Sequence, residues 1–163
     1  ASWANIRDKV AIGELDGAHM LAGMPIAASL GVGALPKATI TAFSLDLNGN
    51  AVTVSNELYE RMAKADPEAM QERPLTARAL KKVIDADKAA GKEPMTFAVV
   101  FPVSTHNYQL RYWLGAAGIN PDQDLRLIVI RRWSPTSRRA TSPAIAWASR
   151  GTSARWKPAS AGC

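Results

Sequence analysis

The stretch from Phe97 to Leu114 limits the possible folds more than any other part of the chain. An apolar run at 95–101 predicts a strand that leads into Pro102, and apolar residues at helical spacing predict a helix over 106–116. A second apolar run, Leu125–Ile130, predicts another strand soon after this helix. Strand, helix and strand in this order favour a β-α-β unit, and therefore an α/β fold with a parallel-rich sheet.

The junction between the first of these strands and the helix predicts a binding site for a small anion. Unpaired backbone N–H groups and the positive end of the helix dipole meet at a helix N-terminus, and His106 lies in the first turn. Alternatively, Ser104 or Thr105 only caps the helix, and His106 donates to a nearby carbonyl. The local pattern alone favours this second interpretation.

Hydrophobic periodicity and turn residues predict the remaining elements. We expect helices over 4–12, 25–31, 55–66 and 75–90, and strands over 15–21, 37–47 and 52–54, with a turn at 47–50. His19 falls on one of these expected strands and is interpreted as a structural residue.

Composition narrows the class of protein. The chain has 163 residues, 47% of them hydrophobic, which suits one ordinary core, and its apolar runs are too short to span a membrane. The single cysteine is the last residue, Cys163, which excludes an internal disulfide framework and a cysteine-based metal site. No metal or other cofactor is expected.

The positive net charge of the chain, +6, comes from its tail, residues 131–163. It holds seven Lys and Arg residues and no Asp or Glu, whereas residues 1–130 hold 13 basic and 14 acidic residues. A disordered basic arm is the ordinary interpretation of such a segment. Nucleic-acid binding through the tail is an alternative function, although we expect no nucleic-acid partner.

Several motifs, in order and at compatible spacing over residues 2–130, resemble one protein family. These motifs are Ser2–Lys9, Leu15–Leu21, Met24–Pro25, Leu47–Asn50 and, most specifically, Phe101–Leu114. The chain resembles the nitrate- and bicarbonate-binding proteins of ABC transporters and their soluble nitrate/nitrite-sensor relatives. The resemblance implies part of a type II periplasmic-binding-protein-like lobe over 1–130, which holds a small oxyanion in a cleft.

The resemblance also implies particular ligand contacts. Carried over by position, Trp3, Asn50 and His106 correspond to family ligand contacts, with possible support from Ser104 and Thr105. An indole N–H, a carboxamide and an imidazole N–H are donors that can surround the oxygens of a small anion. Without the family, Trp3 is interpreted as a packing residue and Asn50 as a turn residue.

The match is incomplete at both ends. The strand and helix that precede the aromatic turn in the family are missing, and no lysine corresponds to the basic residue of nitrate-binding members. In a shifted reading frame, the codons for residues 140–155 permit the family's Gly-Glu-Pro-Trp motif. The tail is therefore interpreted as a possible frameshift product.

The resemblance implies a truncated substrate-binding component of a nitrate, nitrite or bicarbonate transporter, with membrane subunits as partners of the full-length protein. Such a component is periplasmic or membrane-associated. A soluble nitrate/nitrite sensor, which would be cytoplasmic, is an alternative. A third possibility is a hydrolytic enzyme that uses Ser104 and His106, but residues two apart at a helix start do not generally face one another. We therefore expect no catalytic residues.

Overall fold

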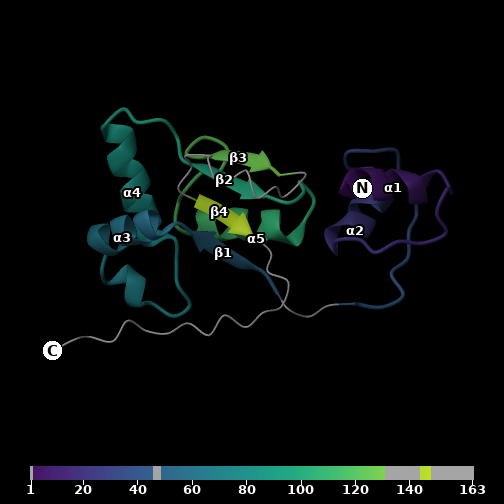
Figure 1. The fold of residues 1–163 in the computed structure, drawn as a ribbon, viewed down its shortest axis with the longest axis horizontal. Coiled ribbons are helices and arrows are strands. Elements are labelled where there is room, and N and C mark those ends of the chain that lie inside the picture. Colours follow the sequence, from purple (N-terminus) through teal and green to yellow (C-terminus); the bar gives the residue numbers. More distant parts are fainter. Residues whose placement is uncertain (1, 46–48, 131–143, 148–163) are drawn as a thin grey trace.

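The computed structural model describes residues 2–45, 49–130 and 144–147. In chain order the elements are α1 (Trp3–Ala11), α2 (Gly23–Leu30), β1 (Ala51–Val54), α3 (Asn56–Ala65), the 3-10 helix η1 (Ala69–Gln71), α4 (Arg78–Ala89), β2 (Thr96–Val99), α5 (Thr105–Ala116), β3 (Arg126–Val129) and β4 (Ala144–Trp147). The strands and α5 form the centre of the molecule, with α3 and α4 on one side and α1 and α2 on the other (Figure 1).

The predicted β-α-β unit is confirmed. Strands β2 and β3 pair in parallel, with Thr96 opposite Arg126 and Val99 opposite Val129, and α5 connects them. Strands β1 and β4 pair antiparallel, with Ala51 opposite Trp147 and Val54 opposite Ala144. The fold class is therefore α/β with parallel strands, and the pairing of the described strands is mixed.

The main core lies in the body of the molecule, which we define as residues 51–130. Sixteen buried residues form one cluster there, including Phe97 on β2, Leu58 and Met62 on α3, and Leu110 and Leu114 on α5. Helix α4 adds an apolar face because its buried residues recur at helical spacing, at Ala79, Leu80, Val83 and Ile84.

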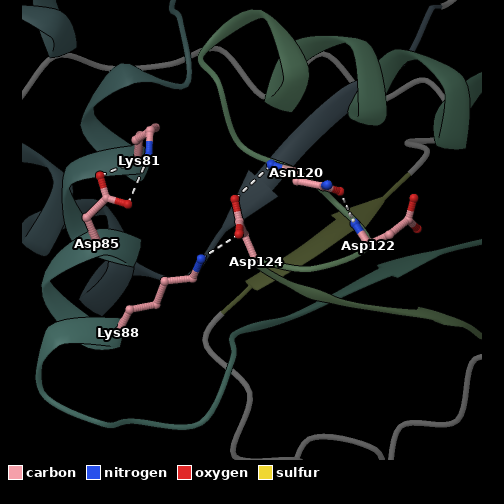
Figure 2. A network of polar contacts seen from close by, with 6 residues as sticks. All are labelled: Lys81, Asp85, Lys88, Asn120, Asp122 and Asp124. Carbon is pink, nitrogen blue, oxygen red and sulfur yellow. Dashed lines mark hydrogen bonds and ion pairs between the residues drawn. The ribbon is translucent and has the colours of Figure 1, made fainter.

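Polar contacts fix the connection between α5 and β3 relative to α4 (Figure 2). The Asp124 carboxylate accepts from the backbone N–H of Asn120 at 2.8 Å and pairs with Lys88 near the end of α4. The ammonium of Lys88, more than any other group, lowers the pKa of Asp124. Asn120 in turn accepts from the backbone N–H of Asp122 at 3.0 Å. This connection is therefore tied both to itself and to its neighbouring helix.

The N-terminal part, residues 2–45, is packed more sparsely. Ser2 caps α1 by accepting from the backbone N–H of Asn5, and Gly31 ends α2 in the left-handed conformation that favours glycine. Met24 and Ala27 of α2 form a small cluster with Val103 of the body. At Gly23 an added Cβ would lie 2.3 Å from the carbonyl oxygen of Val103, so glycine is what permits this close approach.

Two predicted strands were wrong. Residues 15–21 and the described residues of 37–47 form no strand, although α1 and α2 on either side of the first were predicted correctly. A strand needs a partner for its backbone N–H and C=O groups, and no described segment pairs with either stretch. Residues 47 and 48 of the predicted turn lie outside the described residues.

Helix α4 begins three residues later than predicted, at Arg78 rather than Leu75. The carbonyl of Leu75 accepts from the indole Nε1 of Trp113 at 2.9 Å, so its backbone takes part in a tertiary contact. In the tail, which was expected to be a disordered arm, residues 144–147 form β4, and the rest of the tail lies outside the described residues. No helix among the described residues has the length and apolar character that crossing a membrane requires.

Candidate functional site

A cavity of about 160 Å³ lies between the start of β1 and the first turns of α5. It is lined by Asn50, Ala51, Val52, His106, Gln109, Leu110 and Trp113. Two of the residues predicted to bind a ligand, Asn50 and His106, are therefore brought together from distant parts of the sequence. Thr105 is hydrogen-bonded to Asn50 at the edge of this group.

Ser104 caps α5 and is fully buried. Its Oγ accepts from the backbone N–H of Asn107 at 3.2 Å and donates to the carbonyl of Phe101 at 2.7 Å. The capping interpretation of Ser104 is thus confirmed. A hydroxyl committed in this way has its proton held by a carbonyl rather than by a base, which argues against a nucleophilic role.

His106 stands in the first turn of α5 with both ring nitrogens buried and without a hydrogen-bond partner in the described part of the chain. The suggestion that His106 donates to a nearby carbonyl is therefore wrong. Burial lowers the pKa of His106, which favours the neutral imidazole with one N–H donor and one acceptor nitrogen. Leaving a buried donor unpaired costs about 1–3 kcal/mol, so a ligand that accepts from His106 would relieve a real penalty.

Asn50 is oriented by the side chains of α5. Its Nδ2 donates to Gln109 Oε1 at 2.7 Å and to Thr105 Oγ1 at 3.2 Å. No motif in the sequence pointed to Gln109. The available signal was its spacing, because Gln109 lies three residues after His106 and so falls on the same side of the helix.

Trp3 does not line this cavity. It lies in the first turn of α1 and packs against the cluster of Met24, Ala27 and Val103. Its ring meets that of His19 edge to face, with centroids 5.8 Å apart and an interplanar angle of 67°. Because Val103 directly precedes Ser104, this cluster adjoins the loop that leads into α5.

Among the described residues, those that line the cavity include no Lys, Arg, Asp or Glu. Arg111, on the same helix, is paired with Asp122 through two contacts of 2.7 and 2.8 Å. The donors that the described lining offers to a ligand are therefore neutral side chains and the helix N-terminus. Within residues 2–45, 49–130 and 144–147, no group of three or more His, Cys, Asp or Glu side chains is arranged to hold a metal ion.

A second cavity of about 250 Å³ lies beside the first and shares Val52 and Trp113 with it. Its other lining residues are Val54, Tyr59, Met62, Met70 and Leu75. Its polar side-chain groups are the hydroxyl of Tyr59 and the indole N–H of Trp113, and that N–H already donates to the carbonyl of Leu75. The cavity beside α5, which is lined by the side chains of Asn50, His106 and Gln109, is therefore the better candidate site.

Comparison with known proteins gives consistent matches. Residues 1–136 match the NMT1-like family. The chain is 38% identical over 128 residues to the nitrate import ATP-binding protein NrtC of Synechocystis sp. That alignment covers 78% of this chain and 17% of NrtC. It is 35% identical over 137 residues to the nitrate/nitrite binding protein NrtA of Synechococcus elongatus. That alignment covers 79% of this chain and 28% of NrtA.

A solved structure is also similar. The periplasmic nitrate-binding protein NrtA from Synechocystis PCC 6803 superposes with a TM-score of 0.65 at 26% sequence identity, covering 91% of this chain and 37% of that one. The chain thus spans well under half the length of each of these relatives. The similarity concerns one portion of larger proteins.

Proposed function

Because this chain belongs to the NMT1-like family, we propose that it is part of a solute-binding protein for a small oxyanion, of the nitrate, nitrite or bicarbonate type. The single observation that carries the proposal is the pair of buried, unpartnered ring nitrogens of His106 beside a cavity at the N-terminus of α5. A helix N-terminus favours an anion through its free N–H groups and its dipole. A buried imidazole adds a directed donor at the same place.

The expected ligand contacts are His106 and Asn50, with Thr105 and Ser104 in support. The contact from Asn50 is the weaker part of this expectation, because its amide nitrogen already donates to Thr105 and Gln109. Trp3 is kept as a proposed contact on the basis of the family resemblance; it packs beside Val103, next to the start of α5, and does not line the cavity. Neutral donors of this kind suit nitrate, nitrite and bicarbonate alike.

Relatives named as ATP-binding proteins do not make this chain an ATPase. The alignment covers only 17% of NrtC, and the sequence has no Gly-x-x-x-x-Gly-Lys-Ser/Thr motif of the kind that cradles phosphates. We propose that the chain corresponds to a solute-binding portion that, within a longer protein, works with the membrane subunits of an ABC transporter in the periplasm. A cytoplasmic nitrate/nitrite sensor built on the same fold is the second candidate.

Replacement of His106 by Ala tests the proposal. Calorimetric titration with nitrate, nitrite and bicarbonate should show roughly ten- to a hundredfold weaker binding in His106→Ala, because a donor to a charged acceptor is worth about 1.5–3 kcal/mol. Tyr108→Ala is the matched control, since Tyr108 lies on the same helix but is exposed and does not line the cavity. Equal loss in both variants, or binding that survives in His106→Ala, would show that the site is elsewhere.

A longer family polypeptide should bind more tightly than this chain. The described residues that line the cavity come from the start of β1 and from α5, and an opposing lobe would exclude water and could supply a cation. Titration of both proteins under the same conditions measures the difference. Equal and tight binding by the short chain would place the whole site within residues 1–130.

A further inference from the structure

We infer that Gln109 is an additional anion-binding residue and that Asn50 acts by holding the carboxamide of Gln109 in position. The inference rests on the proposed function, because it concerns the same cavity. It begins with the donors of Asn50, which are both engaged, one with Gln109 Oε1 at 2.7 Å and one with Thr105 Oγ1 at 3.2 Å. A carboxamide nitrogen carries two N–H groups, so Asn50 has no donor left for an anion in this arrangement.

Gln109 has the donor capacity that Asn50 lacks. Its Oε1 accepts from Asn50, and its Nε2 has no acceptor among the described residues. Gln109 and His106 both line the cavity and lie three residues apart on α5, which places them on one side of the helix. An anion in the cavity therefore meets an imidazole N–H from the first turn and a carboxamide N–H₂ from the next.

The hydrogen bond from Asn50 to Gln109 reduces the entropic cost of binding a ligand. A glutamine side chain has several rotatable bonds, and fixing it when a ligand binds costs conformational entropy. The contact to Asn50 holds the amide oxygen of Gln109 and so restricts the positions that its amide nitrogen can take. Thr105, the first residue of α5, accepts the second N–H of Asn50 and so fixes Asn50 relative to the helix.

Two substitutions of Gln109 separate a direct contact from a structural one. Gln109→Met removes the donor at similar volume, and we expect about tenfold weaker nitrate binding. Gln109→Glu keeps an oxygen that accepts from Asn50 but replaces the N–H₂ group with a charged oxygen, so we expect a loss on the order of a hundredfold or more. Nitrate affinity in Gln109→Glu equal to that of the unaltered chain would overturn the inference.

A double-mutant cycle tests the role of Asn50. Asn50→Ala should weaken nitrate binding less than Gln109→Met does, and combining the two should cause no further loss beyond Gln109→Met, because Asn50 acts through Gln109. Additive losses would mean that Asn50 contacts the anion itself, which would overturn the positioning role. Denaturant midpoints of the three variants separate loss of binding from loss of folding.

Side-chain amide resonances provide a readout that does not depend on affinity. Nitrate should shift the Nε2–H₂ signals of Gln109 and leave those of Gln123 unchanged, because Gln123 lies in the connection after α5, outside the cavity. If neither nitrate nor bicarbonate binds the unaltered chain, the proposed function fails and this inference fails with it. If both His106→Ala and the unaltered chain behave as expected while Gln109→Met binds normally, only the inference fails.

Discussion

The body and the N-terminal part contain similar apolar residues but use them in different ways. In the body, sixteen residues are buried in one cluster around Phe97. In the N-terminal part, the cluster that packs against the body buries only Met24 and Ala27, while large apolar side chains face solvent at Ile26, Leu30, Val32, Leu35, Ile40, Phe43 and Leu45. Apolar composition alone therefore does not produce a core.

The difference lies in what each apolar face meets. Helices α3, α4 and α5 each turn an apolar side toward β2 or toward one another. Helix α2 packs against Val103 of the body and against partly buried neighbours such as Trp3 and Phe101. The segment after it hydrogen-bonds back to α2, where the backbone N–H of Lys37 donates to the carbonyl of Ala28, but its large apolar side chains stay exposed. Ile40 is 96% exposed and Leu35 86% exposed, values unusual for large apolar side chains clustered in one region. We conclude that the body supports itself, whereas the N-terminal part is held mainly at α2.

Among the substitutions that test this comparison, Phe97→Ala should cause the largest loss of stability. Phe97 is fully buried at the centre of the body, and its truncation should lower the free energy of unfolding by about 3–5 kcal/mol. Phe43→Ala, the same substitution at a residue that is 71% exposed in the N-terminal part, should change it by less than about 0.5 kcal/mol. Denaturant unfolding of both variants measures the contrast, and similar losses would mean that the two parts fold as one unit.

Gly23→Ala should loosen the N-terminal part and leave the body intact. The added methyl group would collide with the carbonyl oxygen of Val103, and overpacking of this kind costs about 1–3 kcal/mol. Hydrogen exchange should show faster exchange in α2 with unchanged protection in α4. Gly115→Ala is the control, because Gly115 is helical with open space around it, and alanine there should stabilise the body by about 1 kcal/mol.

Lowering the pH should destabilise the body more than the N-terminal part. Asp87 accepts from Arg61 at 2.6 Å and from Lys92 at 2.9 Å, and the hydrogen bond from Arg61, above all, lowers the pKa of Asp87 below its ordinary 3.8. The unfolded chain therefore takes up a proton near pH 3.8 while the folded chain does not. Stability from this group is present above that pH and is lost as the pH falls through the folded pKa.

The measurement is the denaturant midpoint of the body at pH 6 and at pH 3. Asp87→Asn should be less stable at pH 6 and should lose less on acidification than the unaltered chain does. In the N-terminal part, the carboxylates of Asp8 and Glu14 are more than half exposed, so their ion pairs contribute little to the free energy of unfolding. Asp8→Asn should therefore change it by less than about 0.5 kcal/mol at pH 6. An equal effect of both substitutions would contradict the assignment to Asp87.

The smallest effect on stability is expected from Leu35→Ser combined with Ile40→Ser. Both side chains are exposed, so the free energy of unfolding should change by less than about 0.5 kcal/mol. Association of the chain at high concentration should fall, because exposed apolar patches promote it. Sedimentation at several concentrations measures this, with Tyr112→Ser on the body as the control. A clear loss of stability in the double variant would show that these residues are packed in solution.

Much of the body could be predicted from the sequence because its signals are local. The helical spacing of Leu80, Val83 and Ile84 predicted α4, and Ser55 and Ser104 were recognised at helix starts where each accepts a backbone N–H three residues later. The strands over 15–21 and 37–47 were wrong because strand formation depends on a partner that composition does not reveal.

In the candidate site, too, some features follow from local sequence signals and others depend on tertiary packing. The sequence by itself determined the strand, the cap and the helix that present His106, because hydrophobic periodicity and capping act within a few residues of the chain. Only the tertiary structure decided that Asn50 meets Gln109 across the cavity, that Trp3 packs beside Val103 instead of lining it, and that His106 lacks a carbonyl partner. Those outcomes depend on which distant segments approach one another, and that choice is made by the packing of the whole body.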